Sequence, residues 1–287
     1  MYFLKNEQIT VEVLDPAADV ARLGSRYCTG GYIWQVSDVH KGPLLTGPEW
    51  PKEPNTFDGQ GMPDMFFRAL GAENAPVGGE VGCIGVGKVR RTSPVEPFYV
   101  FHNREVIEFV HWEVDDRSGK ETPAVHMRTQ HTFRDWSYEL ERSVTLHGRT
   151  VDSHTAIRSL GEAVLPVVWF AHPFFPIPAN NVLCRFLTSV SMPDNPGFFL
   201  DDAGFVNRKA EHDWGRGWYQ SLDYAKEDAG LKVLQKHDLV GQVTAATDFM
   251  PSFLPIWGND KTFSFEPYFT RDFAQGESAA WSIAYTF

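Results

Sequence analysis

Alternation of apolar and polar side chains along short segments constrains the fold of this sequence more than any other feature. Between Ser137 and Leu146, apolar and polar residues alternate, as in a strand with one face in a core and the other in water. His147-Gly148-Arg149 then predicts a tight turn, and Thr150–Ser159 predicts the returning strand. Tyr138, Leu140, Val144 and Leu146 lie on one face, and Ser137, Glu139, Glu141, Ser143 and Thr145 lie on the other.

Many similar runs follow one another, separated by Gly, Pro, Asn and Asp, which is typical of an antiparallel sandwich or barrel. The sequence therefore predicts an all-β fold with few short helices, in one domain over residues 1–287. Only Asp15–Gly24 has helix signals, with Asp15 as N-cap and Gly24 as the stop. The further strand runs are Ile9–Leu14, Tyr32–Val36, Val81–Val89, Val106–Val114, Val164–Phe170, Leu231–Gln235, Gln242–Phe249, Thr262–Phe265 and Ala280–Phe287.

Two long stretches interrupt this pattern, at Lys41–Pro76 and at Pro176–Tyr224. Both are rich in Pro and Gly, yet they carry many aromatic residues, too much apolar material for disorder. Long loops in a compact domain are usually functional when they are ordered. We therefore expect two ordered loops that flank a cleft.

Charge and cysteine content exclude several classes of protein. A formal net charge of −11 disfavours a nucleic-acid partner, because phosphate binding depends on clustered Lys and Arg. No apolar run is long enough to span a membrane and no signal peptide is evident, so we expect a cytoplasmic protein. The widely spaced Cys28, Cys83 and Cys184 favour buried, reduced thiols over disulfides or a zinc site. We expect a monomer or homodimer.

Two strand ends carry the candidate catalytic residues. His172 follows the apolar run Val167–Ala171, and Pro173 then forces the chain out of the ladder. Glu266 ends the alternating run Thr262–Phe265 and again meets a proline. A carboxylate between Phe265 and Pro267 is partly desolvated, which raises its pKa and makes it a better base. The plain alternatives are a core histidine and a glutamate paired with an arginine.

These segments resemble the galactose mutarotase (aldose 1-epimerase) superfamily. The His-Pro-Phe-Phe at 172–175 is similar to its central histidine segment, and Phe-Glu-Pro-Tyr at 265–268 with the final Gln-Gly-Glu and Trp-Ser-Ile-Ala-Tyr-Thr-Phe is similar to its closing segment. Gly24–Ile33, Asp58–Phe66 and Gly82–Arg90 resemble an uncharacterised branch of aldose epimerase-like proteins.

The resemblance implies a large antiparallel β-sandwich that exchanges sugar anomers by acid–base catalysis. Glu266 would take the proton from the anomeric hydroxyl while His172 protonates the ring oxygen. Reference pKa values of about 6.5 for His and about 4.3 for Glu suit these roles without large tuning. The partner would be a small carbohydrate, either neutral or carrying a phosphate or acid group, with no metal and no cofactor.

Four further residues are candidate substrate ligands. Arg90 would bind sugar hydroxyls or an anionic substituent, or else form a structural salt bridge. Gln60 and Asp64 lie in a Gly-rich segment and would line the pocket, or else shape a turn. Trp257 would offer a stacking face to a sugar, or else pack in the core.

Two other functions remain open at this stage. A non-catalytic carbohydrate-binding protein could use the same scaffold, because a fold does not fix a function. The second alternative is a lyase or glycoside hydrolase on a related sandwich. A hydrolase needs two carboxylates flanking one bond, and Glu266 is the single carboxylate that the sequence suggests for this role.

Overall fold

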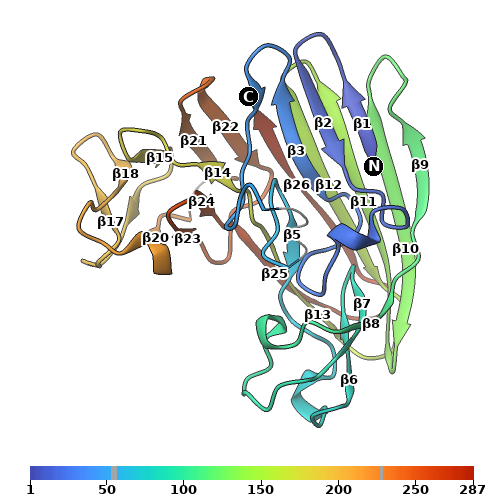
Figure 1. Cartoon of the computed structure of the whole chain (residues 1–287). Helices are drawn as coiled ribbons and strands as arrows, with labels where there is room; N and C mark the ends of the chain where they lie inside the picture. Colours follow the sequence, from blue (N-terminus) through green and yellow to red (C-terminus); the bar gives the residue numbers. More distant parts are fainter. Residues whose placement is uncertain (53–56, 227–228) are drawn as a thin grey trace.

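The fold is all-β, as predicted, with antiparallel strands arranged in two layers (Figure 1). The structure is a computed structural model that describes residues 1–52, 57–226 and 229–287. One layer is a ten-stranded sheet. In spatial order its strands are β17 (Phe198–Leu200), β18 (Phe205–Arg208), β15 (Val182–Phe186), β21 (Lys232–His237), β22 (Gly241–Thr247), β26 (Ser278–Thr286), β12 (Thr150–Ser159), β11 (Trp136–His147), β10 (Ala124–Phe133) and β9 (Glu113–Arg117).

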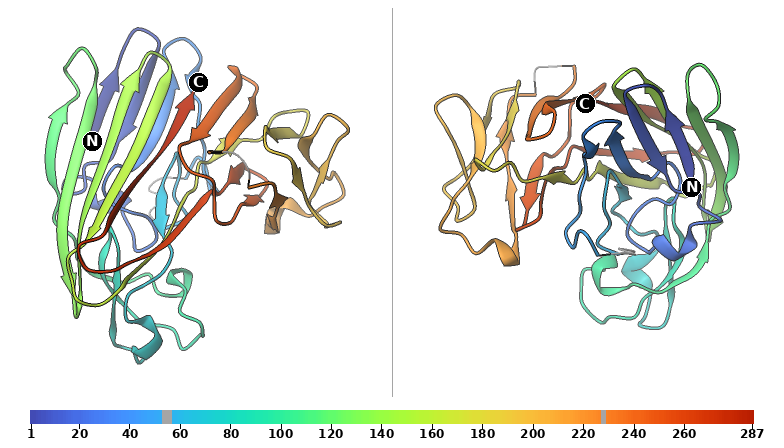
Figure 2. Two further views of the ribbon diagram at one scale, coloured as in Figure 1. Left: turned by 180° about the vertical axis from the view of Figure 1, so that it is seen from behind. Right: turned by 45° about the horizontal axis from the view of Figure 1, so that its top comes forward.

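The second layer consists of three smaller sheets packed against one face of the large sheet. Seen from behind, the long strands of the large sheet lie in front of the first strands of the chain (Figure 2). The smaller sheets are β1 (Tyr2–Lys5), β2 (Ile9–Val13), β3 (Ile33–Asp38) and β4 (Gly42–Pro43); β25 (Tyr268–Phe273), β13 (Leu165–Ala171) and β5 (Asp64–Phe66); and β14 (Phe175–Pro176), β24 (Thr262–Phe265), β23 (Pro255–Gly258) and β19 (Trp218–Ser221).

Smaller elements lie outside these layers. A three-stranded sheet forms a separate lobe at the bottom of the view in Figure 1. In the described residues, no helix is long and apolar enough to cross a membrane. The remaining strands are β6 (Glu80–Cys83), β7 (Gly87–Arg90) and β8 (Val106–Phe109) of that lobe, with β16 (Val190–Ser191) and β20 (Asp223–Tyr224); the 3₁₀ turns are η1 (Val20–Arg22), η2 (Ala72–Asn74), η3 (Val100–His102) and η4 (Trp214–Arg216).

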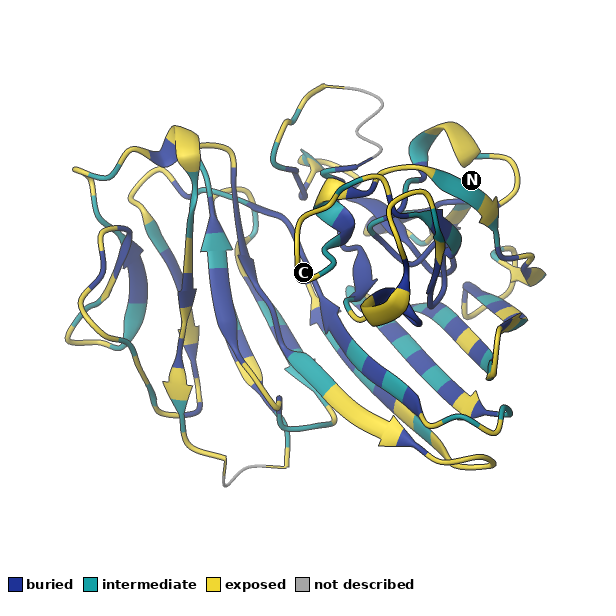
Figure 3. Ribbon diagram, turned by 90° about the horizontal axis from the view of Figure 1, so that it is seen from below, coloured by how far each residue is buried: buried dark blue, intermediate teal, exposed yellow. Residues whose placement is uncertain are grey.

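The core lies between the two layers, where the alternating strands place their apolar side chains. Figure 3 shows buried and exposed positions alternating along the strands of the large sheet, as predicted for Ser137–Leu146 and its partner. Aromatic rings join the layers, since Phe269 of β25 stacks on Trp281 of β26 at 4.1 Å between centroids. Cys28, Cys83 and Cys184 are buried and free, as expected.

Two local predictions were wrong. Asp15–Gly24 contains the 3₁₀ turn η1 in place of a helix. The Asp15 carboxylate accepts from the N–H groups of Ala17 and Ala18, as an N-cap does, but Leu23 is already extended, so the turns stop before a helix can propagate. The predicted strand Val81–Val89 is a hairpin of β6 and β7. Gly85 in the turn and Gly87 at the start of β7 both take positive φ, which turns the chain back on itself.

Both long stretches contain short strands where we expected loops. Lys41–Pro76 includes β4 and β5, while its residues 53–56 lie outside the described part of the chain. Pro176–Tyr224 includes β15, β17, β18 and β19, among others. These strands are only two to five residues long, and the pairing of β15 with β18 shifts register between Val182 and Cys184. Such short, irregular strands carry little alternation for a sequence pattern to reveal.

A buried ion pair joins the two layers near the centre of the molecule. The Arg142 guanidinium of β11 contacts the Asp64 carboxylate of β5, and the two side chains are only 1% and 5% exposed. The same guanidinium donates to the hydroxyls of Thr155 and Ser153 and, at 3.3 Å, to the Gly30 carbonyl. Each of the three guanidinium nitrogens therefore donates to an oxygen, as a buried charge requires.

We predict that Arg142→Met lowers the free energy of unfolding by about 3–5 kcal/mol, because the substitution leaves the Asp64 carboxylate buried without its cation. Urea denaturation measures this change. The matched control is Arg117→Met, which removes the partner of Asp115 from a pair whose side chains are 53% and 56% exposed and should leave stability nearly unchanged. Equal stability of the two variants would contradict a central role for the buried pair.

Candidate active site

The ends of two strands place His172 beside Glu266. β13 ends at Ala171, and β24 ends at Phe265, so each functional side chain follows its strand directly. The His172 N–H donates to the Pro63 carbonyl at 2.8 Å, and the Glu266 N–H donates to the Pro255 carbonyl at 2.9 Å. Both backbones are thus fixed by neighbouring segments rather than left in mobile loops.

The two side chains contact each other in a nearly closed environment. His172 Nε2 lies 3.4 Å from Glu266 Oε1, and the side chains are 4% and 6% exposed. The other imidazole nitrogen, Nδ1, has no hydrogen-bond partner among the described residues. One polar contact therefore orients the two side chains toward each other. The Nδ1 atom of His172 can still form a hydrogen bond with a ligand.

Burial makes this pair uncharged near neutral pH. It raises the pKa of Glu266 from the ordinary 4.5 to about 8, and the nearby Arg26 only partly opposes the rise. Burial, with Arg26 acting in the same direction, lowers the pKa of His172 well below its usual value. The upward shift expected for Glu266 is confirmed, but the expectation that ordinary pKa values would hold is wrong for both groups. The resting pair holds one proton, on the carboxyl group.

Aromatic rings surround the imidazole. The centroid of Phe174 lies 4.4 Å from that of His172, and Phe170, Trp257 and Tyr27 lie within 5.8–6.1 Å of it. These rings exclude water, which is the physical cause of both pKa shifts. The structure places Trp257 next to the pair, where it also packs against the hydrophobic cluster that contains Phe170 and Phe174.

Arg26 is a charged neighbour of the pair that sequence analysis did not single out. Its guanidinium carbon lies 4.8 Å from the Tyr27 ring centroid and 4.7 Å from that of Phe101. The nearest carboxylate oxygen among the described residues belongs to Asp58, at 3.7 Å, and Arg26 Nε is buried without a hydrogen-bond partner there. Arg26 lies within Gly24–Ile33, one of the segments that resemble the aldose epimerase-like proteins, and it directly precedes Tyr27. This place in the sequence is the one feature that could have marked Arg26 as a site residue.

Two tyrosines also lie close to Glu266. Burial chiefly, and the Glu266 charge in addition, raise the pKa of the Tyr219 and Tyr268 phenols. Tyr219 is 47% exposed, and it lies opposite Trp257 in the pairing of β19 with β23. Tyr268 follows Glu266-Pro267 directly, and its ring stacks on Phe170 at 4.4 Å. Only Tyr268 was near enough in sequence to be suspected.

Three predicted ligands are engaged by other protein groups. Arg90 is in the separate lobe, where Nε donates to Glu105 at 2.7 Å, the salt bridge that sequence analysis kept as the alternative. Asp64 is engaged by Arg142 in the core. Gln60 is buried, with its N–H 3.3 Å from the Tyr32 hydroxyl oxygen and its Nε2 3.4 Å from the Trp34 carbonyl.

The chemistry available here is proton transfer. A neutral carboxyl group and a neutral imidazole in contact supply one acid and one base in a dry site. Within the described residues, no group of three or more His, Cys, Asp and Glu side chains is placed to hold a metal ion.

Comparisons with known proteins identify the fold. No protein-family profile and no curated protein matches the sequence. Among solved structures, a galactose mutarotase related enzyme from Lactobacillus acidophilus aligns over 99% of this chain and 96% of its own, with a TM-score of 0.59 and 13% identity. A galactose mutarotase-like protein from Lactobacillus casei aligns over 100% and 99%, with a TM-score of 0.56 and 11% identity. The predicted sandwich class is confirmed: the chain has the galactose mutarotase-like fold.

We predict that wild type loses stability relative to Glu266→Gln as pH rises from about 4.5 to 8. A carboxyl group whose pKa is raised on folding stabilises the folded state while it is protonated, and this contribution is lost as the pH passes through the folded-state pKa. The loss is at most about 1.4 kcal/mol per pH unit. Chemical denaturation at several pH values checks it, and a constant difference between the two proteins would contradict the shift.

Proposed function

We propose that this chain, which has the galactose mutarotase-like fold, is an acid–base enzyme that interconverts the α and β anomers of a sugar. The observation that carries the proposal is the buried contact between His172 and Glu266 at two strand ends. The named mutarotase-related structures of the same fold support it. A buried acid–base pair lowers the stability of the folded state when a polar atom such as His172 Nδ1 has no hydrogen-bond partner among the described residues. Groups of this kind are concentrated at functional sites.

The reaction needs two proton transfers at neighbouring oxygens. A base takes the proton of the C1 hydroxyl, the C1=O1 double bond forms, and the C1–O5 bond breaks as O5 receives a proton from an acid. Rotation about C1–C2 presents the other carbonyl face, and the same steps in reverse close the ring. Each positioned acid or base is worth about 10²–10⁴-fold in rate.

The His172–Glu266 pair can supply both transfers because it holds one proton. In the resting pair, the Glu266 carboxyl group is the acid and the His172 imidazole is the base. Transfer of that proton across the Nε2–Oε1 contact of 3.4 Å gives the opposite assignment, the one that the family resemblance implies. Both assignments leave the pair with one proton at the end of each cycle, so the enzyme is regenerated without help from solvent.

The surroundings of the pair suit a sugar. Trp257, Tyr268 and the half-exposed Tyr219 offer ring faces to the C–H face of a pyranose, and phenol hydroxyls can bond its hydroxyl groups. We propose that Trp257 lies against the sugar ring. We further propose that Arg26, rather than Arg90, is the arginine that donates to the substrate.

We predict that wild type accelerates anomer exchange and that His172→Ala and Glu266→Gln each lower the rate by about 10²–10⁴-fold. Freshly dissolved α-glucose and α-galactose, their 6-phosphates and a uronic acid are followed by NMR. His126→Ala and Glu141→Gln are the matched controls, because both residues lie on the large sheet away from the pair, and both should retain wild-type rates.

The same spectra separate the alternatives. Line broadening of a sugar without exchange, unchanged in both variants, would replace the enzyme with a carbohydrate-binding protein. No exchange and no broadening with any of the sugars would reject the proposed function and leave the fold standing.

A further inference from the structure

A closed circuit of side-chain contacts leads away from His172 and returns to it. Each step is a ring–ring or a cation–ring contact of 4.7–6.4 Å. Phe170 and Phe67 separate Tyr99 from the imidazole on one path, and Tyr27 and Arg26 separate Phe101 from it on the other. In order, the members are His172, Phe170, Phe67, Tyr99, Phe101, Arg26 and Tyr27.

The far side of the circuit is partly exposed. Phe67, Tyr99 and Phe101 all retain intermediate exposure, whereas Phe170, next to His172, is 3% exposed. Phe67, Phe101 and Phe170 belong to a hydrophobic cluster distinct from the main core between the layers. The rings therefore form a strip that starts at the buried pair and reaches solvent.

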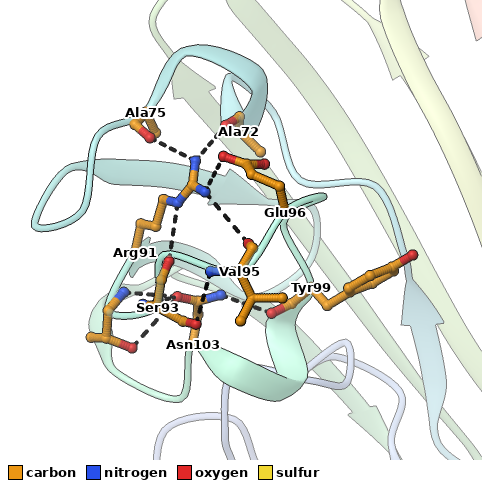
Figure 4. Close-up of polar contacts among 9 residues, drawn as sticks. Ala72, Ala75, Arg91, Ser93, Val95, Glu96, Tyr99 and Asn103 are labelled. Atoms are coloured by element: carbon orange, nitrogen blue, oxygen red, sulfur yellow. Dashed lines mark hydrogen bonds and ion pairs between the residues drawn. The ribbon is translucent and has the colours of Figure 1, made fainter.

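The loop that carries Tyr99 and Phe101 is held rigidly by two buried polar residues. The Arg91 guanidinium donates to the carbonyls of Ala75 at 2.8 Å and Ser93 at 3.3 Å, and it contacts the Glu96 carboxylate. Asn103 accepts from the Ser93 N–H and donates to the Tyr99 carbonyl at 2.8 Å. Figure 4 shows the Tyr99 ring extending away from these contacts. Hydrogen bonds from Arg91 and Asn103 thus hold the backbone of this loop, while the rings of Tyr99 and Phe101 stay partly exposed.

Unpartnered polar atoms lie at both ends of this strip. His172 Nδ1 and Arg26 Nε are buried, and neither has a hydrogen-bond partner among the described residues. Arg26 lies against the Phe101 ring, so the far end of the strip combines a cation with aromatic faces. Such a combination suits a ligand with hydroxyl groups on its edges and C–H groups on its faces.

We propose that Tyr99 and Phe101 form a second sugar-binding subsite, so that the preferred ligand is an oligosaccharide whose reducing-end ring lies at His172 and Glu266. This inference rests on the proposed function for the position of the first ring. Neither Tyr99 nor Phe101 contacts His172 directly, because Phe170 and Phe67 lie between Tyr99 and the imidazole, and Tyr27 and Arg26 lie between Phe101 and the imidazole. We therefore place the next sugar ring, rather than the reacting ring, against Tyr99 and Phe101. A monosaccharide would leave these rings unused.

The test compares anomer exchange of glucose with that of maltose, cellobiose and lactose. We expect wild type to show a higher kcat/KM for at least one of the disaccharides than for glucose. Tyr99→Ala should lower the disaccharide value by about three- to tenfold and leave the glucose value unchanged, because one stacked ring is lost. Phe101→Leu keeps apolar volume for folding while removing the ring, and it should have the same selective effect. The matched control is Phe199→Ala, which removes a 42%-exposed ring from β17 and should change neither value.

Equal losses for both sugar classes in Tyr99→Ala and Phe101→Leu would overturn the subsite and show that the rings only support the fold. If no sugar is exchanged by wild type, the proposed function fails, and binding then decides the subsite by itself. Disaccharide line broadening in wild type that weakens in both variants would support it, and broadening that is absent or insensitive to both substitutions would overturn it.

Discussion

The buried ion pair between Arg142 and Asp64 is the interaction on which the rest of the structure depends. Arg142 comes from β11, an interior strand of the large sheet, and Asp64 comes from β5 of the opposite layer. Asp64 lies opposite Ala171 in the pairing of β5 with β13, and the preceding carbonyl, that of Pro63, accepts from the His172 N–H. The contact that fixes the distance between the layers is therefore one strand away from the imidazole, and any sliding of β5 would move the acid–base pair with it.

Burial raises the pKa of a carboxyl group at both places, to about 6 at Asp64 and to about 8 at Glu266, but the two places differ in how many polar partners the buried groups have. At Arg142 it is compensated, because four protein oxygens satisfy the guanidinium. At His172 and Glu266 it is not, because the two side chains share a single polar contact within the described residues, and both groups respond by becoming neutral. The first arrangement stabilises a structure, whereas the second stores free energy that a polar ligand can recover by adding the missing hydrogen bonds.

The sequence predicted what depends on local pattern. Alternation identified the all-β class, and a proline after each strand placed His172 and Glu266 at strand ends. It did not predict what depends on pairing between distant segments. Arg142 sits on the apolar face of the best alternating strand, but only the fold reveals that Asp64, 78 residues away, neutralises it. Arg90 has the residue type and motif expected of a ligand, yet the hairpin of β6 and β7 directs it to Glu105, while Arg26 reaches the pair from a segment before β3.

The position of β26 in the large sheet sets the order in which this protein can acquire its structure. The strand lies between β12 and β22, with Thr286 opposite Thr150 on one side and Thr244 on the other. Until it is inserted, the two halves of the sheet have no shared hydrogen-bonded ladder, and Trp281 cannot cover Trp169 of β13. The pairing of β26 with β12 joins residues more than a hundred positions apart, and pairings between such distant segments tend to form slowly. Insertion of β26 therefore covers two strand edges at once, those of β12 and β22, that would otherwise be open to other chains.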